Sequence, residues 1–248
     1  MALRNELRSQ GDYLFKYRSY LPLVFILPAL LVYIQNQFYL QRIEQTQAEL
    51  YELICIAVSL FGLLIRMITI GYSADNTSGR NTKVGQVADS INTTGMYSIF
   101  RHPLYVGNFF MWLGIAGFTQ NFWFLVAFIF MYWIYYERIM FAEEEFLISK
   151  YEDEYLNWSK RVPAFIPKLG NWEKSINTFS WIKVIRQEKT GILNLFLTIL
   201  MVKIIGELVV NHQLLNDLKY WIAFGAALFY YIVVKIIQKK TSLLKYDR

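Results

Sequence analysis

Residues 101–145 read RHPLYVGNFFMWLGIAGFTQNFWFLVAFIFMYWIYYERIMFAEEE, and this stretch decides how the chain folds. It contains two apolar runs, 104–118 and 122–141, which are separated only by Thr119-Gln120-Asn121. So short a connection is typical of two neighbouring antiparallel helices. The stretch therefore predicts a helical hairpin.

Charged residues stand at both ends of this hairpin. Arg101 and His102 precede its first apolar run, and Glu143-Glu144-Glu145 follow its second. A hairpin returns the chain to the side from which it started, so the acids should meet the basic pair at one face of the membrane. Ionisable groups beside a bilayer are costly and usually functional. We therefore expect a pocket there that binds a charged cofactor next to lipid.

The composition is that of an integral membrane protein. Of the 248 residues, 55% are hydrophobic and 18% are aromatic, and the mean hydropathy is +0.28. Only 18% are charged, which is below the roughly 25% of a soluble domain. One cysteine, Cys55, and two histidines, His102 and His212, predict neither a disulfide framework nor a metal site. We expect a compact all-α helical bundle in the membrane.

Six apolar runs are candidates for membrane-spanning helices, which need about 20 residues each. They lie at 20–39, 50–70, 104–118, 122–141, 192–210 and 221–237. Arg66 lies near the end of the second run and is expected to extend its side chain to the interface. Lys203 and Glu207 interrupt the fifth run at a spacing that predicts an ion pair within one helix.

Lysine and arginine are concentrated on one side of this six-helix arrangement. They crowd the N-terminal segment, the segment with Arg80 and Lys83, the stretch 142–191 and the C-terminal tail. By the positive-inside rule both termini then face the cytoplasm. A five-helix alternative, in which 104–118 is merely re-entrant, would break this charge pattern. We expect the inner membrane of a bacterium as the location.

Two further segments are not simple loops. Residues 142–158 contain neither Gly nor Pro and should continue the preceding helix into the cytoplasm, until Pro163 ends it. Residues 172–188 place apolar side chains three or four positions apart, which predicts an amphipathic helix in the membrane interface. The chain then divides into N-terminal membrane helices (1–71), a core that carries the charged motifs (72–170) and a C-terminal part with the interfacial helix and two spans (171–248).

Two motifs lie between residues 77 and 167. The first is Thr94-Gly95-Met96-Tyr97 followed by Arg101-His102-Pro103-Leu104-Tyr105-Val106-Gly107. The second is Glu143-Glu144 with Leu147, then Tyr155, then Val162-Pro163 with Pro167. In order and spacing this pair of motifs resembles the isoprenylcysteine carboxyl methyltransferase family and its phospholipid N-methyltransferase relatives.

The chain departs from this family in three places. Tyr151-Glu152 stands where the family usually has Phe-Gly, and Trp158 replaces a second tyrosine. Both departures concern the part of the site that would cover a cofactor. Two more apolar runs follow the second motif, where many bacterial members end. These extra helices are candidates for a substrate gate or for a dimer contact.

The resemblance implies a methyltransferase that uses S-adenosylmethionine. It implies that Glu143 and Glu144 accept hydrogen bonds from the cofactor's amino group and that His102 donates to its carboxylate or ribose. Arg101 is the candidate for steering an anionic acceptor, and Glu144 is the candidate base if the acceptor is an amine. The candidate catalytic residues are thus Arg101 and Glu144. The candidate cofactor-binding residues are Thr94, Gly95, Tyr97, His102, Pro103, Tyr105, Gly107, Glu143 and Glu144.

The expected acceptor is a hydrophobic or lipid-like molecule in the cytosolic leaflet, methylated on a carboxylate, an amine or a thiol. Membrane lipids are further expected partners and nucleic acid is not, while a homodimer is left open. Two other classes remain as alternatives, namely an NADPH-dependent membrane reductase of the sterol or steroid type and a non-enzymatic membrane scaffold. If these residues form no active site, Arg101 and His102 are expected to anchor the helix at the membrane interface. Glu143-Glu144-Glu145 is then expected to be a solvated helix face.

Overall fold

The structure is a computed structural model that describes residues 2–18, 21–40, 45–75, 77 and 88–244. Arg80 and Lys83, two of the charges used to orient the chain, lie outside the described residues. The described part is helical and contains no strand, which confirms the all-α prediction. The α-helices are α1 (Leu3–Tyr17), α2 (Leu21–Leu40), α3 (Gln45–Tyr72), α4 (Met96–Ile99), α5 (Pro103–Gly117), α6 (Phe122–Ser159), α7 (Trp181–Val210) and α8 (Leu218–Lys240), and Leu169–Asn171 forms a short 3₁₀ turn.

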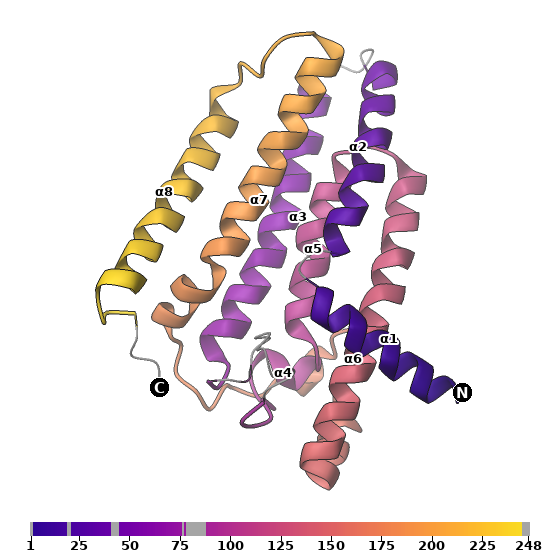
Figure 1. Cartoon of the computed structure of the whole chain (residues 1–248), viewed down its shortest axis with the longest axis vertical. Helices are drawn as coiled ribbons and strands as arrows, with labels where there is room; N and C mark the ends of the chain where they lie inside the picture. The colour runs from indigo at the N-terminus through magenta and orange to yellow at the C-terminus, as the bar shows by residue number, and fades with distance from the viewer. Residues whose placement is uncertain (1, 19–20, 41–44, 76, 78–87, 245–248) are drawn as a thin grey trace.

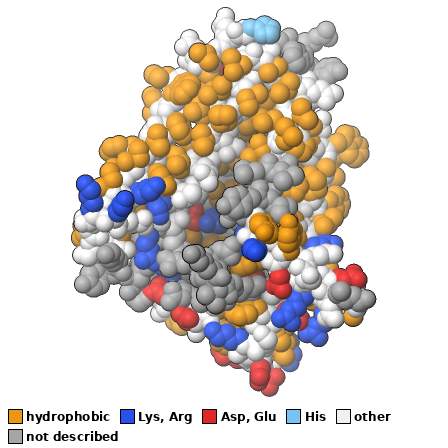
Figure 2. Space-filling model, in the orientation of Figure 1, with side chains coloured by type: hydrophobic (Ala, Val, Ile, Leu, Met, Phe, Trp, Pro, Cys, Tyr) orange, Lys and Arg blue, Asp and Glu red, His pale blue; other side chains and the backbone are white. Residues whose placement is uncertain are grey.

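All six apolar runs form helices, and they lie side by side in an elongated bundle (Figure 1). Helices α3, α6, α7 and α8 are long and apolar enough to cross a membrane. That α2 and the 15-residue α5 also cross it stays a prediction. Hydrophobic side chains cover the upper part of the face shown in Figure 2, and charged side chains gather at its lower end. This distribution is typical of a bundle whose apolar upper part faces lipid.

Helices α3 and α5 run against each other along small residues. A Cβ added at Gly62 would collide with the carbonyl of Gly107, and one added at Gly114 would collide with the side chain of Ser59. The hydroxyl of Ser59 donates to the carbonyl of Met111 across this interface (3.0 Å). Small residues at such positions let two membrane helices approach each other backbone to backbone. This contact fixes α5, and with it the start of the hairpin, against α3.

An ion pair joins α7 to α3 at the end of the bundle opposite α4. The ammonium group of Lys203 binds the carboxylate of Glu52, and the hydroxyl of Tyr220 on α8 donates to the same carboxylate (2.6 Å). The predicted ion pair between Lys203 and Glu207 is therefore wrong, since Glu207 instead accepts a hydrogen bond from the side chain of Asn211 (2.7 Å). A partner on another helix neutralises Lys203 and also ties three helices together.

Helix α6 continues well beyond the bundle, as the absence of Gly and Pro over 142–158 predicts (Figure 1). It ends at Ser159, before Pro163. The backbone of Glu152 breaks the helix near this end, with φ 45° and ψ −119°. Helix α1 lies across α6 (Figure 1), where Arg4 pairs with Glu145 (2.7 Å) and Gly11 sits against the carbonyl of Arg138.

The predicted interfacial helix over 172–188 is wrong over its first nine residues, and the remainder is the start of α7. Residues 172–180 are not helical, and α7 begins at Trp181, capped by the hydroxyl of Ser180. The segment is held instead by the C-terminal end of α3. The side chain of Asn177 donates to the carbonyl of Tyr72 (3.1 Å), and the amide of Ser180 donates to the carbonyl of Gly71 (2.9 Å). These contacts satisfy carbonyls that a helix end leaves without partners.

Candidate active site

The two sequence motifs meet through their backbones. The amide of Arg101 donates to the carbonyl of Pro163 (2.8 Å), and the amide of His102 donates to the carbonyl of Ala164 (3.1 Å). His102 is the N-cap residue of α5, and Pro103 occupies the first turn, where its missing N–H costs nothing. The start of the hairpin is thus positioned by the segment that follows α6.

Arg101 and Glu144 form a two-pronged ion pair between the start of α5 and the middle of α6. Nε and Nη2 of Arg101 donate to Oε1 and Oε2 of Glu144 at 2.9 and 3.1 Å. Nη1 donates to the carbonyls of Ser159 (3.0 Å) and Val162 (2.7 Å). Four of the five N–H groups of a guanidinium are thereby engaged. In this arrangement Arg101 fastens the end of α6 to the site, and its steering of an acceptor stays a prediction.

His102 lies between both predicted carboxylates and is buried. Its Nε2 is 2.9 Å from Oε1 of Glu144, and its Nδ1 is 3.6 Å from Oε2 of Glu143. Burial by itself would lower the pKa of His102, but its hydrogen bonds to Glu143 and Glu144, together with their negative charges, raise that pKa above the ordinary histidine value. The imidazole is therefore held as a cation over a wider pH range than a free histidine.

Tyr105 extends this cluster one turn along α5. Its hydroxyl donates to Oε1 of Glu143 (2.6 Å), and its ring stacks on that of His102 with centroids 5.8 Å apart. The hydroxyl of Tyr132 on α6 donates to the carbonyl of Tyr105 (2.7 Å). The phenol and the imidazole together hold the carboxylate of Glu143 at the edge of a cavity.

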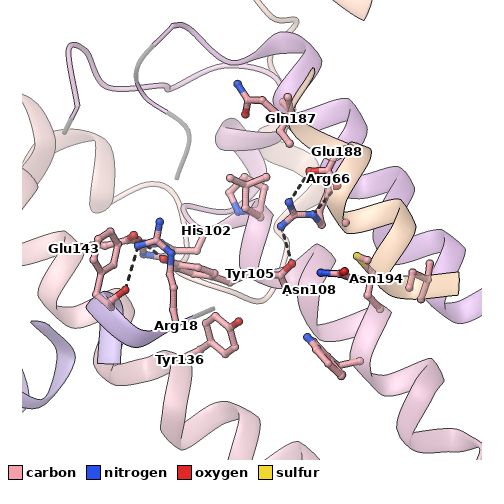
Figure 3. A pocket seen from close by; sticks show the side chains of 18 of the residues that line it. Arg18, Arg66, His102, Tyr105, Asn108, Tyr136, Glu143, Gln187, Glu188 and Asn194 are labelled. Carbon is pink, nitrogen blue, oxygen red and sulfur yellow. Dashed lines mark hydrogen bonds and ion pairs between the residues drawn. The ribbon is translucent and has the colours of Figure 1, made fainter. Parts of the chain in front are cut away.

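This cavity has a volume of about 1230 Å³ and extends from the charged cluster up between the helices. Figure 3 shows His102, Tyr105 and Glu143 on one side of it and Arg66, Asn108 and Glu188 on the other. Of the predicted site residues, those that line the cavity are Tyr97, Arg101, His102, Pro103, Tyr105 and Glu143. The lining therefore contains polar groups from both motifs.

The other predicted residues lie behind the cavity lining. The hydroxyl of Thr94 accepts from the amide of Ile176 (3.3 Å), and the amide of Gly95 donates to the carbonyl of Glu173 (2.9 Å). Gly95 needs its positive φ of 64° to make this turn, which places Tyr97 at the cavity. Gly107 faces α3, where a Cβ would meet Arg66. Direct contact of these residues, or of Glu144, with a cofactor stays a prediction.

Two aromatic side chains of the lining, Tyr155 and Trp158, each contain a buried polar atom that makes no hydrogen bond with the described residues. Nε1 of Trp158 is buried and makes no hydrogen bond with them, although the Trp158 side chain lines the cavity. The neighbouring Tyr155 packs edge-on against this indole, with centroids 5.4 Å apart. A buried donor without a partner is rare in folded proteins and requires an explanation. A ligand with an acceptor atom at this end of the cavity would supply the partner.

Sequence reasoning missed a further group of residues in the cavity lining, which includes Arg66, Asn108 and Glu188. Arg66 does not extend to the interface as predicted, because Glu188 holds it inside the bundle at 2.5 Å. An arginine and a glutamate within otherwise apolar helices are a signal of a buried pair, but their separation of 122 residues hides the pairing. Glu188 also lies at the end of the segment 172–188, which was predicted to be an interfacial helix and not part of the bundle.

The fold and the site together define a membrane-embedded helical domain with a charged pocket at one end. Residues 53–154 match the family model described as phospholipid methyltransferase. This part of the chain is therefore similar to the membrane methyltransferases that include phospholipid and isoprenylcysteine methyltransferases, and the resemblance seen in the two motifs is confirmed.

The curated relatives include isoprenylcysteine methyltransferases and a metal-resistance protein. Protein-S-isoprenylcysteine O-methyltransferase of Schizosaccharomyces pombe is 38% identical over 76 residues, which cover 30% of this chain and 32% of the relative. The protein of the same name in Saccharomyces cerevisiae is 32% identical over 114 residues, or 46% of this chain and 47% of the relative. The cobalt-zinc-cadmium resistance protein CzcN of Cupriavidus metallidurans is 29% identical over 101 residues, which cover 38% of this chain and 46% of the relative.

The matched region spans only a third to a half of the length of these relatives. No solved structure matches the chain. The four membrane-capable helices and the membrane methyltransferase relatives make it an integral membrane protein. Helices α7 and α8 lie outside the matched residues. The division of the chain into three parts stays a prediction.

Proposed function

We propose that the protein transfers a methyl group from S-adenosylmethionine to a hydrophobic or lipid-like acceptor at the cytosolic leaflet. The observation that carries this proposal is the meeting of His102 with Glu143 and Glu144 at one end of a cavity, within the residues that match the methyltransferase family. We further propose that this end of the bundle and both termini face the cytoplasm of a bacterium.

The residues at the cavity fit the cofactor. S-adenosylmethionine carries an ammonium, a carboxylate and a sulfonium. The carboxylate of Glu143 lines the cavity and suits the ammonium, whereas the imidazolium of His102 suits the carboxylate. The unpartnered Nε1 of Trp158 provides one more donor for an acceptor atom of the nucleoside or of the carboxylate.

When bound, the cofactor supplies an activated methyl group on its sulfonium, so that the protein has to align the acceptor and exclude water. Positioning of this kind is worth several kcal/mol of the barrier. Glu144 holds Arg101 and His102 in place, and this positions the groups that face the cofactor. If the acceptor is an amine, a base must take its proton, and Glu144 remains the proposed base.

Calorimetry of the purified protein with S-adenosylmethionine tests this proposal. Binding by the wild type is expected, with at least tenfold weaker binding by Glu143→Gln. Glu145→Gln is the matched control, since Glu145 is the adjacent acid but pairs with Arg4 outside the cavity lining. A parallel titration with NADPH tests the reductase alternative. Binding of NADPH without binding of S-adenosylmethionine would overturn the proposal.

Methyl-labelled cofactor incubated with the protein and native membranes then identifies the acceptor. Label is expected in a lipid or lipid-modified fraction with the wild type and not with His102→Ala. Equal labelling by both proteins would show that the charged cluster does not form the active site.

A further inference from the structure

A second polar cluster lies inside the cavity, on the side opposite His102 and Glu143 (Figure 3). Nε and Nη2 of Arg66 on α3 donate to Oε2 and Oε1 of Glu188 on α7, at 3.2 and 2.5 Å. Nη1 of Arg66 donates to Oδ1 of Asn108 on α5 (2.6 Å). The side chain of Glu188 is fully buried. Three helices thus contribute one residue each to the cluster.

Holding the helices together does not account for this cluster. Burying an ion pair costs several kcal/mol per ion, and apolar residues of similar size often stabilise a fold equally well or better. The second ion pair among the membrane helices, Lys203 with Glu52, is absent from the cavity lining, whereas all three members of the Arg66 cluster line it. Ionisable residues buried in a membrane bundle and facing a cavity usually belong to a binding pathway.

The cluster occupies the middle level of the cavity. On α5, His102 precedes Asn108 by six residues, which corresponds to about 9 Å along a helix, and the apolar Ile115 follows about 10 Å further on. On α7, Glu188 is followed at intervals of seven residues by Leu195 and Val202, both of which line the cavity. Arg186 and Lys189, which flank Glu188 on α7, line the cavity as well. The cavity is therefore lined by charged groups at one end and in the middle, and by apolar groups at the other end.

The apolar end extends to the outside of the bundle. Leu197 and Met201 of α7 line the cavity, yet they are 38% and 48% exposed. On α2, Leu30 lines the same end. An apolar chain in this part of the cavity would be continuous with the surrounding lipid.

The free hydrogen-bonding capacity of the cluster defines the group it can bind. The hydrogen bonds to Glu188 and Asn108 engage three of the five N–H groups of the Arg66 guanidinium. The remaining two have no partner among the described residues. Glu188 balances the charge of Arg66, so the cluster presents hydrogen-bond donors without a net positive charge. Such a site favours an uncharged oxygen over an anion, because Glu188 already matches the charge of Arg66 and an anion would lie beside its carboxylate.

We propose that Arg66, Asn108 and Glu188 form the recognition site for the methyl acceptor and select an uncharged oxygen, such as that of an amide or an ester. The acceptor is then an amphipathic molecule with its reactive group near His102 and Glu143. Its neutral oxygen lies at Arg66, and its apolar chain lies between α2, α5 and α7. This inference rests on the proposed methyl transfer, although its test does not depend on turnover.

Binding of three probes with the same twelve-carbon chain, measured by native mass spectrometry, tests the inference. The probes are dodecanamide, dodecanoate and dodecylamine. The wild type is expected to bind dodecanamide at least about tenfold more tightly than dodecanoate. The double variant Arg66→Met with Glu188→Leu should lose this preference and keep its melting temperature. Lys203→Met with Glu52→Gln, the matched pair outside the cavity lining, should retain the preference.

A single substitution gives a test that does not rely on loss of binding. Glu188→Gln keeps the shape and the hydrogen-bond acceptor but leaves the charge of Arg66 unbalanced. Its preference should shift towards dodecanoate by about tenfold or more. An unchanged preference in this variant, or a wild type that favours dodecanoate, would overturn the inference.

The outcomes separate this inference from the proposed function. A wild type that binds S-adenosylmethionine and shows no preference for dodecanamide retains the methyltransferase proposal and rejects the acceptor site. A wild type that shows the preference, lost in the double variant, without binding S-adenosylmethionine retains the site and rejects the proposed reaction.

Discussion

Nε2 of His102 lies 2.9 Å from Oε1 of Glu144, which ties the first residue of the hairpin to the helix that closes it. The same carboxylate oxygen lies 2.9 Å from Nε of Arg101. One side chain on α6 therefore holds two consecutive residues of the loop before α5. Because both residues depend on this carboxylate, the site should be sensitive to changes at Glu144.

Replacement of Glu144 by Gln should destabilise the protein by about 1.5–3 kcal/mol, the cost typical of losing hydrogen bonds to a charged group. The amide keeps one acceptor oxygen but presents an NH₂ group to the guanidinium of Arg101, which is largely buried. Thermal unfolding in detergent measures the effect. Glu145→Gln serves as the control, because the partner of Glu145, Arg4, is exposed and an exposed ion pair contributes little. Equal melting temperatures for the two variants would contradict the prediction.

The stability that His102 contributes should fall as the pH rises. Its pKa in the folded protein lies above the ordinary value of about 6.5, because Glu143 and Glu144 stabilise the charged form against the opposing effect of burial. This contribution is fully present below the pKa of the unfolded state and is lost as the pH passes through the raised pKa. The melting temperature of the wild type should exceed that of His102→Asn by more at pH 6 than at pH 9. A constant difference across this range would show that His102 does not titrate as inferred.

Replacement of Glu152 by Gly should stabilise the protein. Glu152 has φ 45° and ψ −119°, a conformation that glycine adopts readily and that costs other residues about 1–3 kcal/mol. Its side chain is exposed, so that little packing is lost with it. The family that the sequence resembles usually has glycine at this position. Glu152→Ala controls for loss of the carboxylate, since alanine keeps the Cβ and the strain. Equal melting temperatures for the glycine and alanine variants would contradict this account.

The sequence predicted the helices well because their signal is local. Each of the six apolar runs has the length and composition that a membrane helix needs, and the short Thr119–Asn121 connection forces the hairpin. The charged residues at its two ends meet for the same reason. The described part of the chain contains these features close to where composition placed them.

Errors arose where a distant partner decides the conformation. The apolar spacing over 172–180 fits a helix, yet Asn177 and Ser180 bond the last carbonyls of α3 instead. Arg66 lies near the end of its apolar run, so the sequence suggests that its side chain reaches the aqueous interface. Glu188, which is 122 residues away, instead pairs with it inside the bundle. Periodicity within one segment contains no information about such partners. Both errors concern contacts between the C-terminal part of α3 and the part of the chain that leads into α7.

Replacement of Trp158 by Phe should weaken cofactor binding without loss of stability. Nε1 of Trp158 has no hydrogen-bond partner among the described residues, so that its removal takes away no hydrogen bond from the fold, and the phenyl ring retains contact with Tyr155. If the cofactor supplies the missing acceptor, the variant should bind S-adenosylmethionine about tenfold more weakly, which corresponds to the roughly 1–1.5 kcal/mol of one hydrogen bond. Calorimetry together with thermal unfolding separates the two effects. Trp158→Tyr restores the family residue and, with its hydroxyl donor, should recover part of the affinity. An unchanged dissociation constant for Trp158→Phe would show that the indole faces an empty part of the cavity and that the cofactor lies elsewhere.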